Sequence, residues 1–341
     1  MVDCFSRGYT DGMIRVMVPR RVALALVLAA VLVLENRPAA QPQVSTPFVG
    51  ITYTDRWEAS PRRVRMHIAQ VDLTAPGLRF KVSPPGGDRE VVRQSTLAFL
   101  TQERAQLAIN GHFFLPFPST DRTAWVIGLA ASEGRVYSAF ESPEQRYALV
   151  ANAPAINIDR HNRASIVRLD PSRPDRRHVR ERVELWNVVA GSSQIISSGA
   201  VTVPAYKDAT HPAGLLEPGG PNGYSNDKAW AEIAAARTAI GLSRDRRTLT
   251  LFTVDARGGS EGMRLGEVAQ FLIENYRVWD ALNLDGGGST TMAMADPATN
   301  QATAVNTSSD NPDGREVATS LAVFARRKRC QTPCQNLRAW H

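Results

Sequence analysis

A carboxylate followed by three glycines is the sequence feature best suited to chemistry. Residues 280–294 read DALNLDGGGSTTMAM, so an apolar run that carries Asn283 ends at Asp285. The residues that follow are Gly286, Gly287, Gly288 and Ser289. Glycine is costly inside regular structure, so three in a row indicate a tight turn or a backbone that a ligand approaches closely. Consecutive N–H groups of this kind are suited to bind an anion, and Asp285 is the leading catalytic carboxylate.

Two further predicted strands end in polar corners. In LAINGHFF, residues 107–114, a short apolar strand delivers Asn110, and His112 precedes two phenylalanines. Taken alone, this motif is more typical of a turn in which Asn110 satisfies backbone donors and His112 is structural. The strand LTLFTV, residues 249–254, runs directly into Asp255, the second carboxylate candidate.

Other charged residues lie beside these corners. Arg237 opens the strand RTAIGL, and a guanidinium can pair bidentately with phosphate oxygens. Glu267 lies near the first turn of a helix predicted over 262–275, where it serves either as an acid or base or as a complement to the helix dipole. Asp310 and Arg315 fall in a loop before a closing strand.

The elements that must position these residues predict an α+β fold. We expect a single domain with a mixed, largely antiparallel sheet and a few covering helices, and a site along one edge of the sheet. Strand-like alternation occurs at 64–73, and Ser95 is suited to cap a helix over 95–103. Strand, helix and strand from 249 to 285 resemble a βαβ unit. The charged segment 164–182 is predicted to be an exposed excursion or a helix.

Length and charge exclude some functions. The 341 residues are ample for a sizeable core. The net charge of +7 comes mainly from arginine, because lysine occurs only at Lys81, Lys207, Lys228 and Lys328. The arginines are scattered rather than interleaved with aromatic residues, which disfavours nucleic acid as a partner.

The N-terminus indicates export. Arginines precede an apolar run over 22–34, which is too short to span a bilayer comfortably and is typical of a signal peptide. We therefore expect residues 1–40 to be a signal peptide or an uncleaved membrane anchor, 41–47 a linker, 48–328 the folded domain and 329–341 a tail. The protein would be secreted or periplasmic, and it would contact a membrane only through an uncleaved N-terminal segment.

Several motifs together resemble the phosphodiester glycosidase domain family. They are NGHFF, RTAIGL, TVDAR, GMRLGEVAQFL, ALNLDGGGSTTM and VNTSSDNPDGREVA, and the similarity runs from about Ile68 to Ala325. DGGGS alone would be a weak signal, whereas six motifs in the same order and spacing are specific. Departures are Ala256, Ser308 and Thr319, where the family commonly has Gly, Pro and Asn; these put fine specificity in doubt and leave the strand-end residues intact.

The resemblance implies hydrolysis of a sugar-1-phosphodiester to a free sugar and a phosphomonoester, in polysaccharide or cell-envelope glycan metabolism. The partner would be a phosphorylated sugar or glycan. Such a reaction builds oxocarbenium character on the sugar, and the leaving group is already a good anion. Asp285 would be the catalytic carboxylate, with Asp255 and Glu267 as further catalytic candidates. The candidates for substrate binding are Asn110, His112, Arg237, Asn283, Gly286, Gly287, Gly288, Ser289, Asp310 and Arg315.

Other functions fit the sequence less well. A serine hydrolase at Ser289 lacks the G-x-S-x-G elbow and is followed only by His341. Neither nucleotide-binding glycine motif, GxGxxG or GxxxxGK[ST], is present. No cofactor is required, and no ligand spacing compels a metal site, although a divalent cation near the Asp and Asn residues stays open. The remaining alternative is a non-catalytic, exported glycan-binding module on the same scaffold.

Overall fold

The computed structural model describes residues 41–140, 152–203, 231–307 and 311–328. All of these residues belong to one compact unit that begins at Gln41. The predicted signal or anchor segment (1–40) and the tail (329–341) lie outside the described residues. No helix in the described part of the chain has the length and apolarity needed to cross a membrane.

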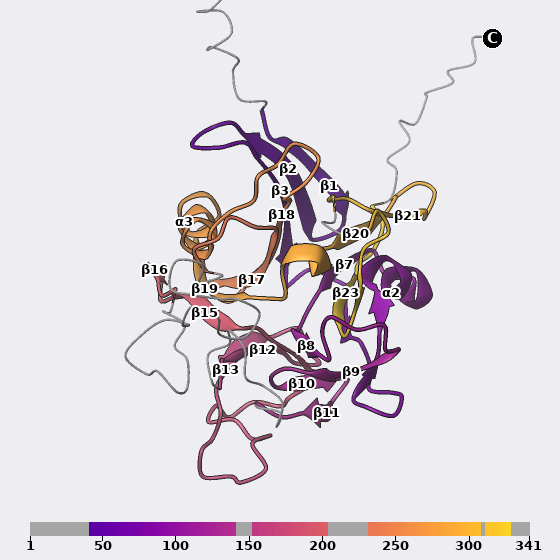
Figure 1. Cartoon of the computed structure of the whole chain (residues 1–341), viewed down its shortest axis with the longest axis vertical. Helices are drawn as coiled ribbons and strands as arrows, with labels where there is room; N and C mark the ends of the chain where they lie inside the picture. Colours follow the sequence, from indigo (N-terminus) through magenta and orange to yellow (C-terminus); the bar gives the residue numbers. More distant parts are fainter. Residues whose placement is uncertain (1–40, 141–151, 204–230, 308–310, 329–341) are drawn as a thin grey trace, which may run out of the picture. The chain divides into compact units, whose positions relative to one another are not determined.

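An eight-stranded sheet is the largest sheet in the described residues (Figure 1). Its strand order is β1-β2-β3-β18-β17-β19-β15-β16. The strands are β1 (Gln43–Phe48), β2 (Ile51–Glu58), β3 (Val64–Asp72), β15 (Ser193–Ser197), β16 (Ala200–Val201), β17 (Arg237–Ser243), β18 (Thr248–Val254) and β19 (Val278–Asn283). Strands distant in sequence are therefore neighbours in its centre.

Two five-stranded sheets accompany it. One has the order β21-β20-β7-β23-β4 and the other β11-β10-β14-β12-β13. Their strands are β4 (Arg79–Val82), β7 (Leu107–Asn110), β10 (Ala130–Ser132), β11 (Arg135–Ser138), β12 (Ala155–Ile158), β13 (Ala164–Val167), β14 (Asn187–Ala190), β20 (Met292–Ala295), β21 (Ala302–Ala304) and β23 (Ser320–Phe324). Short ladders pair β6 (Gln94–Ser95) with β22 (Glu316–Val317), and β9 (Thr123–Val126) with both β5 (Val91–Val92) and β8 (Phe114–Leu115).

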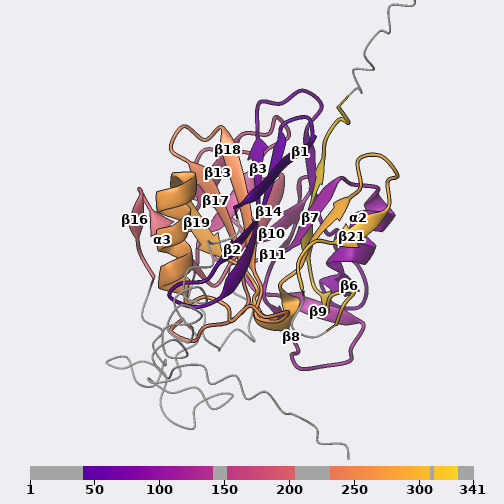
Figure 2. The same cartoon turned by 90° about the horizontal axis from the view of Figure 1, so that it is seen from above.

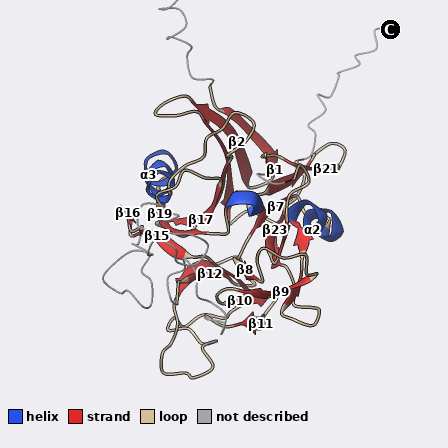
Figure 3. Cartoon of the chain, viewed as in Figure 1, coloured by secondary structure: helices blue, strands red, loops and turns tan. Residues whose placement is uncertain are grey.

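Two α-helices occur in the described residues (Figure 3). Helix α2 (Thr96–Glu103) packs against β7 and β20, and the Ser95 side chain accepts a hydrogen bond from the Ala98 N–H, which confirms the predicted cap. Helix α3 (Leu265–Tyr276) packs against β19 and β15, on the other side of the fold from α2 (Figure 2). Its buried face includes Leu265, Val268 and Leu272, and burying each such side chain contributes about 1.5–3 kcal/mol.

The expectation of largely antiparallel strands is confirmed, whereas the expectation of a single mixed sheet is wrong. Every strand pair in the described residues is antiparallel, and the strands form several sheets rather than one. The segment β18–α3–β19 does cross over as predicted, so β18 and β19 run in the same direction. However, β17 lies between them and pairs antiparallel with both. The α+β class holds only in part, because the helices are few.

Two predicted irregular segments contain strands. Residues 43–48, expected mostly as linker, form β1, whose Val44 pairs with Thr54 of β2. This strand lies at a sheet edge and most of its residues are exposed, so it lacks the apolar alternation of a half-buried strand. Likewise, Ala164–Val167 at the start of the charged segment forms β13 and pairs with β12. This strand has only four residues, most of them buried. The charged residues that follow it mask its short apolar pattern in the sequence.

One glycine is required by close backbone contact. A Cβ on Gly191 would lie 1.9 Å from the carbonyl oxygen of Asn283, where β15 begins to pair with β19. We predict that Gly191→Ala lowers the free energy of unfolding by about 3 kcal/mol, because the backbones must separate. Gly266→Ala is the matched control: nothing lies within 4 Å of its added Cβ in α3, and it should be neutral or stabilise by up to about 1 kcal/mol. Urea denaturation measures both, and an unchanged stability of the Gly191 variant would contradict the prediction.

Candidate active site

Four strand ends bring most of the predicted polar residues together. Arg237 is the first residue of β17, Asp255 directly follows β18, Asp285 lies two residues beyond the end of β19, and Asn110 ends β7. Because β17 is antiparallel to β18 and β19, its beginning lies at the same end of the sheet as their ends. These three strands are central in the eight-stranded sheet. The candidate residues therefore gather at strand ends and between two sheets, whereas the sequence analysis expected a site along one edge of the sheet.

The glycine segment forms a single 3-10 turn, Gly287–Ser289. Gly287 has a φ of +58°, a conformation that favours glycine, and a Cβ at Gly286 would lie 2.9 Å from the Ala236 carbonyl oxygen. The Gly287 N–H donates to that same carbonyl at 2.8 Å. This N–H is thus engaged by the protein. It does not serve as an open donor for an anion in this arrangement.

Two asparagines hold the backbone on either side of this turn. Asn110 Nδ2 donates to the Asp285 carbonyl (2.7 Å), and its Oδ1 accepts the Thr291 N–H (3.0 Å). Asn306 Nδ2 donates to the Thr290 carbonyl (3.0 Å), and its Oδ1 accepts the Met292 N–H (2.7 Å). A primary amide has both donors and an acceptor, so it can bridge two backbone groups at once. We call residues 285–292 the clamped turn.

Asp255 has no solvent exposure and is hydrogen-bonded to Asn306, which holds the clamped turn. Its Oδ1 accepts from Asn306 Nδ2 (3.1 Å) and the Thr307 N–H (2.9 Å), and its Oδ2 lies 3.2 Å from His67 Nε2. His67 is also fully buried, and its Nδ1 lies 2.7 Å from the Tyr53 hydroxyl. Both carboxylate oxygens are therefore hydrogen-bonded to protein groups, in an arrangement that braces Asn306. Asp285, in contrast, is only half-buried.

Arg237 is 3% exposed, and protein carbonyls accept hydrogen bonds from its guanidinium. Its Nε donates to the Met263 carbonyl (3.1 Å) and its Nη2 to the Ile233 carbonyl. A Cβ at Gly286 would come within 3.9 Å of the Arg237 Cδ. The Arg237 side chain is thus buried and held beside Gly286 of the clamped turn.

Glu267 is engaged in holding a helix. Its Oε2 accepts the Arg264 N–H at 2.8 Å, which closes the start of α3, and it forms an ion pair with Arg62. Of the two sequence interpretations, the structure favours the helix-terminal one. None of the hydrogen bonds found in the described residues connects Glu267 with Asp255 or Asn110.

The remaining candidates divide between the turn and the core. Arg315 Nη1 donates to Ser289 Oγ at 3.4 Å, next to the glycines. Asn283 Nδ2 donates to Ser192 Oγ (2.9 Å), while its Oδ1 is buried without a hydrogen-bond partner among the described residues. Asp310 lies outside the described residues.

His112 is a core histidine. It has no exposed surface, the Ala190 N–H donates to its Nε2 (2.9 Å), and its Nδ1 lies 2.8 Å from Thr319 Oγ1. Nε2 also lies 3.1 Å from the Leu129 carbonyl oxygen, so protein groups contact both ring nitrogens. Burial lowers the pKa of His112 to about 4, and this effect outweighs the opposing contact with the Leu129 carbonyl.

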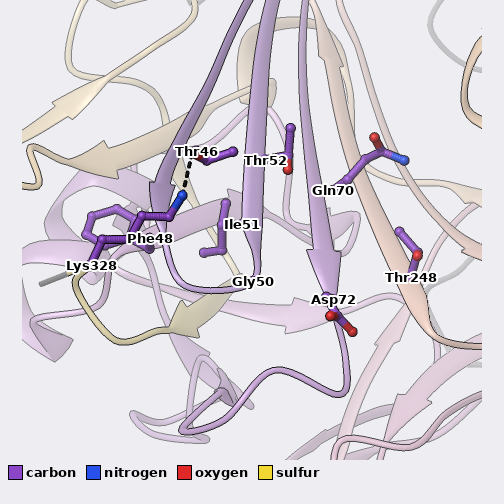
Figure 4. A pocket seen from close by; sticks show the side chains of 9 residues that line it. All are labelled: Thr46, Phe48, Gly50, Ile51, Thr52, Gln70, Asp72, Thr248 and Lys328. Atoms are coloured by element: carbon purple, nitrogen blue, oxygen red, sulfur yellow. Dashed lines mark hydrogen bonds between the residues drawn. The ribbon is translucent and has the colours of Figure 1, made fainter. Parts of the chain in front are cut away.

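In the described part of the chain, no three His, Cys, Asp or Glu side chains gather in a way that could hold a metal ion. A surface cavity of about 350 Å³ is lined by residues that include Gly50, Asp72, Thr248 and Lys328 (Figure 4). Thr248 begins β18 and Asp255 follows its end, so this cavity lies at the opposite end of the sheet from the clamped turn. The cavity is therefore separate from the candidate site.

Several residues of the site were not predicted as functional. His67 falls within the predicted strand over 64–73, and Asn306 falls within the motif VNTSSDNPDGREVA, and neither was given a functional role. Thr238, Thr290 and Thr291 are fully buried, and Thr238 Oγ1 donates to Asn110 Oδ1 at 2.9 Å. A sequence signal did exist for His67: it interrupts the apolar run of a strand whose neighbours on both sides are buried.

The fold and site together define an antiparallel β protein in which buried asparagines hold a glycine-rich turn beside a half-buried carboxylate. The family model for phosphodiester glycosidase matches residues 103–324. The chain belongs to the phosphodiester glycosidase family.

Individual relatives are similar over shorter or more divergent stretches. The N-acetylglucosamine-1-phosphodiester alpha-N-acetylglucosaminidases of Homo sapiens and Mus musculus are 42% and 40% identical over 65 residues. These residues are 19% of this chain and only 12% of each relative.

Two solved structures have a similar fold. The zebrafish N-acetylglucosamine-1-phosphodiester alpha-N-acetylglucosaminidase catalytic domain, auto-inhibited by its pro-peptide, has a TM-score of 0.54 and 21% identity, over 86% of this chain and 91% of that one. A hypothetical protein from Synechocystis has a TM-score of 0.56 and 17% identity, over 84% of this chain and 68% of that one. At these identities the likeness concerns the fold.

The burial of His112 predicts how stability depends on pH. The unfolded imidazole has a pKa near 6.5, whereas the folded one is at about 4. The unfolded state therefore binds more protons between these values, so stability is full above pH 6.5 and falls as pH decreases towards 4. The loss should be about 3 kcal/mol at pH 4, since one pKa unit corresponds to about 1.4 kcal/mol.

Urea denaturation of the wild type and of His112→Asn between pH 4 and 7 measures this contribution. The wild type should show a steeper pH dependence than the variant, and His178→Asn, which removes an exposed imidazole, serves as the control. NMR of the folded wild type gives an independent test. A His112 ring that becomes protonated at pH 6 would contradict the prediction.

The hydrogen bonds of Asp255 predict that its alanine and asparagine variants differ. Asp255→Ala leaves the Thr307 N–H and His67 Nε2 without their partner, and should cost about 3 kcal/mol or more. Asp255→Asn should cost about 1 kcal/mol. Its carboxamide oxygen can face Asn306 and Thr307, and its NH2 can donate to Nε2 once His67 moves its proton to Nδ1 and donates to Tyr53. Equal losses in chemical denaturation would show instead that the network requires the negative charge.

Proposed function

We propose that this protein hydrolyses the glycosidic bond of a sugar-1-phosphodiester. The bond between the anomeric carbon and the phosphate oxygen breaks, a water oxygen bonds to the anomeric carbon, and the products are a free sugar and a phosphomonoester. The observation that carries the proposal is the half-buried Asp285 at the start of the clamped turn, in a chain of the phosphodiester glycosidase family.

In this proposal Asp285 faces the anomeric carbon as it gains positive charge. A carboxylate fixed in advance near a developing cation stabilises the transition state more than the ground state. The backbone hydrogen bonds of Asn110 to Asp285 and Thr291 would supply that fixed position. Asp255, wholly buried and hydrogen-bonded through both oxygens, would act through Asn306 as a positioning residue.

The phosphate would be bound by arginine. Arg315 reaches Ser289 of the clamped turn, and Arg237 lies beside Gly286. Guanidinium groups bind phosphate oxygens through parallel N–H donors. The phosphomonoester leaves as an anion without strong acid assistance, so the mechanism does not require Glu267, which closes the start of α3.

The relatives support the class of reaction. The printed names of the human and mouse relatives describe action on an N-acetylglucosamine-1-phosphodiester, and this chain matches only 12% of their length. We therefore propose the phosphodiester-linked sugar as the substrate class and leave its identity to a substrate screen. We further propose that the protein is exported by residues 1–40 and acts in polysaccharide or cell-envelope glycan metabolism.

Asp285→Asn tests the proposed role directly. The substitution keeps the size of the side chain and removes its charge, so release of phosphomonoester from glycosyl-1-phosphodiesters should fall by about 10²–10⁴-fold, with the thermal midpoint unchanged. Asp245→Asn, an exposed carboxylate on the turn between β17 and β18, is the control and should keep full activity. Near wild-type activity of Asp285→Asn would refute the role. Glycan binding by the wild type without any product release would favour the non-catalytic module.

A further inference from the structure

His67 is a fully buried polar side chain at the point where the apolar core of the eight-stranded sheet ends. Across the sheet it lies opposite Asp55 of β2 on one side and Thr253 of β18 on the other. The next residue of β3 on the same face is Ala69, which belongs to the main hydrophobic core. Burying an imidazole costs free energy unless its nitrogens have partners, so the contacts of His67 indicate its role.

The two ring nitrogens of His67 contact different parts of the fold. Nε2 lies 3.2 Å from Asp255 Oδ2, and Nδ1 lies 2.7 Å from the Tyr53 hydroxyl. Asp55 Oδ1 is farther from Nδ1, at 3.9 Å, and both Asp55 oxygens accept hydrogen bonds from Arg65. The Tyr53 ring is nearly parallel to the imidazole, with an interplanar angle of 15°. Tyr53 is therefore the hydrogen-bond partner of Nδ1, on the side of the ring away from Asp255.

Asp255 in turn fixes the orientation of Asn306. An ionised carboxylate only accepts hydrogen bonds, so the end of the Asn306 amide that faces Asp255 is the Nδ2 donor, at 3.1 Å. The amide oxygen then points the other way and accepts the Met292 N–H, while Nδ2 also donates to the Thr290 carbonyl. A reversed amide would set its oxygen against two other acceptors. Asp255 thus decides which hydrogen bonds Asn306 makes with the clamped turn.

The backbone that Asn306 holds is coupled to the proposed catalytic carboxylate. The two residues bound by Asn306 lie on either side of Thr291. Through a single amide, Asn110 binds both the Thr291 N–H and the Asp285 carbonyl. A change at Asn306 is therefore transmitted to Asp285, and a misplacement of about 1 Å can cost about 100-fold in rate.

Tyr53 lies at the outer end of this chain of contacts. It is half-buried, and burial raises the pKa of its hydroxyl, with the Asp55 carboxylate adding to this effect. The hydroxyl therefore keeps its proton and remains able to donate to His67 Nδ1. Tyr53 and His67 both precede residues 103–324, which the family model matches.

We propose that Tyr53 and His67 are positioning residues, which hold the clamped turn in place from β2 and β3. Their effect reaches the turn through Asp255 and Asn306, and neither of them touches the substrate. The expected effect on rate rests on the proposed phosphodiester hydrolysis. The expected effect on the backbone of the turn does not depend on it.

Three substitutions grade the loss of this support, with kcat measured well below each thermal midpoint. Tyr53→Phe removes one hydroxyl and should lower kcat for a glycosyl-1-phosphodiester about 3- to 10-fold, with KM unchanged. His67→Leu leaves Asp255 without a partner and should lower kcat about 30- to 100-fold. His67→Gln restores an N–H donor and should recover part of that loss.

Tyr276→Phe is the matched control and should keep full activity. It removes the hydroxyl of another half-buried tyrosine. Tyr276 ends α3 just before β19 begins, whereas Asp285 lies beyond the other end of β19.

Hydrogen–deuterium exchange tests the same chain of contacts without substrate. In Tyr53→Phe, a peptide covering residues 285–292 should exchange about 3- to 10-fold faster than in the wild type, because Asn306 and Asn110 protect the N–H groups of Met292 and Thr291 less well. Peptides from α2 should be unchanged, and Tyr276→Phe should leave residues 285–292 at the wild-type rate.

Other results would overturn the proposal. They are a Tyr53→Phe variant with wild-type kcat, a loss that appears in KM instead, unchanged exchange at 285–292, and equal kcat values for His67→Leu and His67→Gln. A lower thermal midpoint with unchanged kcat and exchange would mean that Tyr53 only stabilises the fold. If the wild type cleaves no glycosyl-1-phosphodiester, the proposed hydrolysis fails and exchange alone decides: faster exchange at 285–292 supports the positioning role, and unchanged exchange refutes it.

Discussion

The site depends on side chains that hydrogen-bond to the backbone of the glycine-rich turn and hold it in one conformation. Three consecutive glycines lose more conformational entropy on folding than other residues, and one of them adopts a positive φ. Asn110 compensates by bridging the backbone before and after the turn, and Asn306 holds the backbone that follows it. Both amides are almost wholly buried, where an unmade hydrogen bond is costly. The clamped turn therefore has a defined conformation, and the backbone of Asp285 is held in place by Asn110.

The two aspartates differ because their surroundings differ. Asp255 is enclosed and receives hydrogen bonds on both oxygens from two separate segments, from His67 on one side and from Asn306 and Thr307 on the other. Asp285 keeps a half-buried position at the start of the turn. Carboxylates in contrasting environments commonly take different roles in one site. Under our proposal, Asp255 positions the clamped turn through Asn306, and Asp285 contacts the substrate.

Topology explains why such distant segments meet. The crossover through α3 makes β18 and β19 run the same way, and β17 between them begins where they end. Arg237, Asp255 and Asp285 consequently share one end of the eight-stranded sheet. Asn110 reaches the same place from β7 of another sheet, which pairs with β20 immediately after the turn. The arrangement links two sheets through one loop, and the loop carries the proposed chemistry.

The sequence by itself determined the local elements and the residues at their ends. The helix capped by Ser95, the strand over 249–254 and the closing strand Ser320–Phe324 follow from local patterns. The six motifs indicated the family. What only the tertiary structure decided is the environment of each side chain: that Asp255 and His112 are enclosed, that Glu267 closes a helix, and that Phe117 lies against Arg315. His67 and Asp255 are 188 residues apart in sequence, and Asn306 and Asp255 are 51 apart. Burial and hydrogen bonds over such separations arise when sheets pack together, and no local periodicity records them.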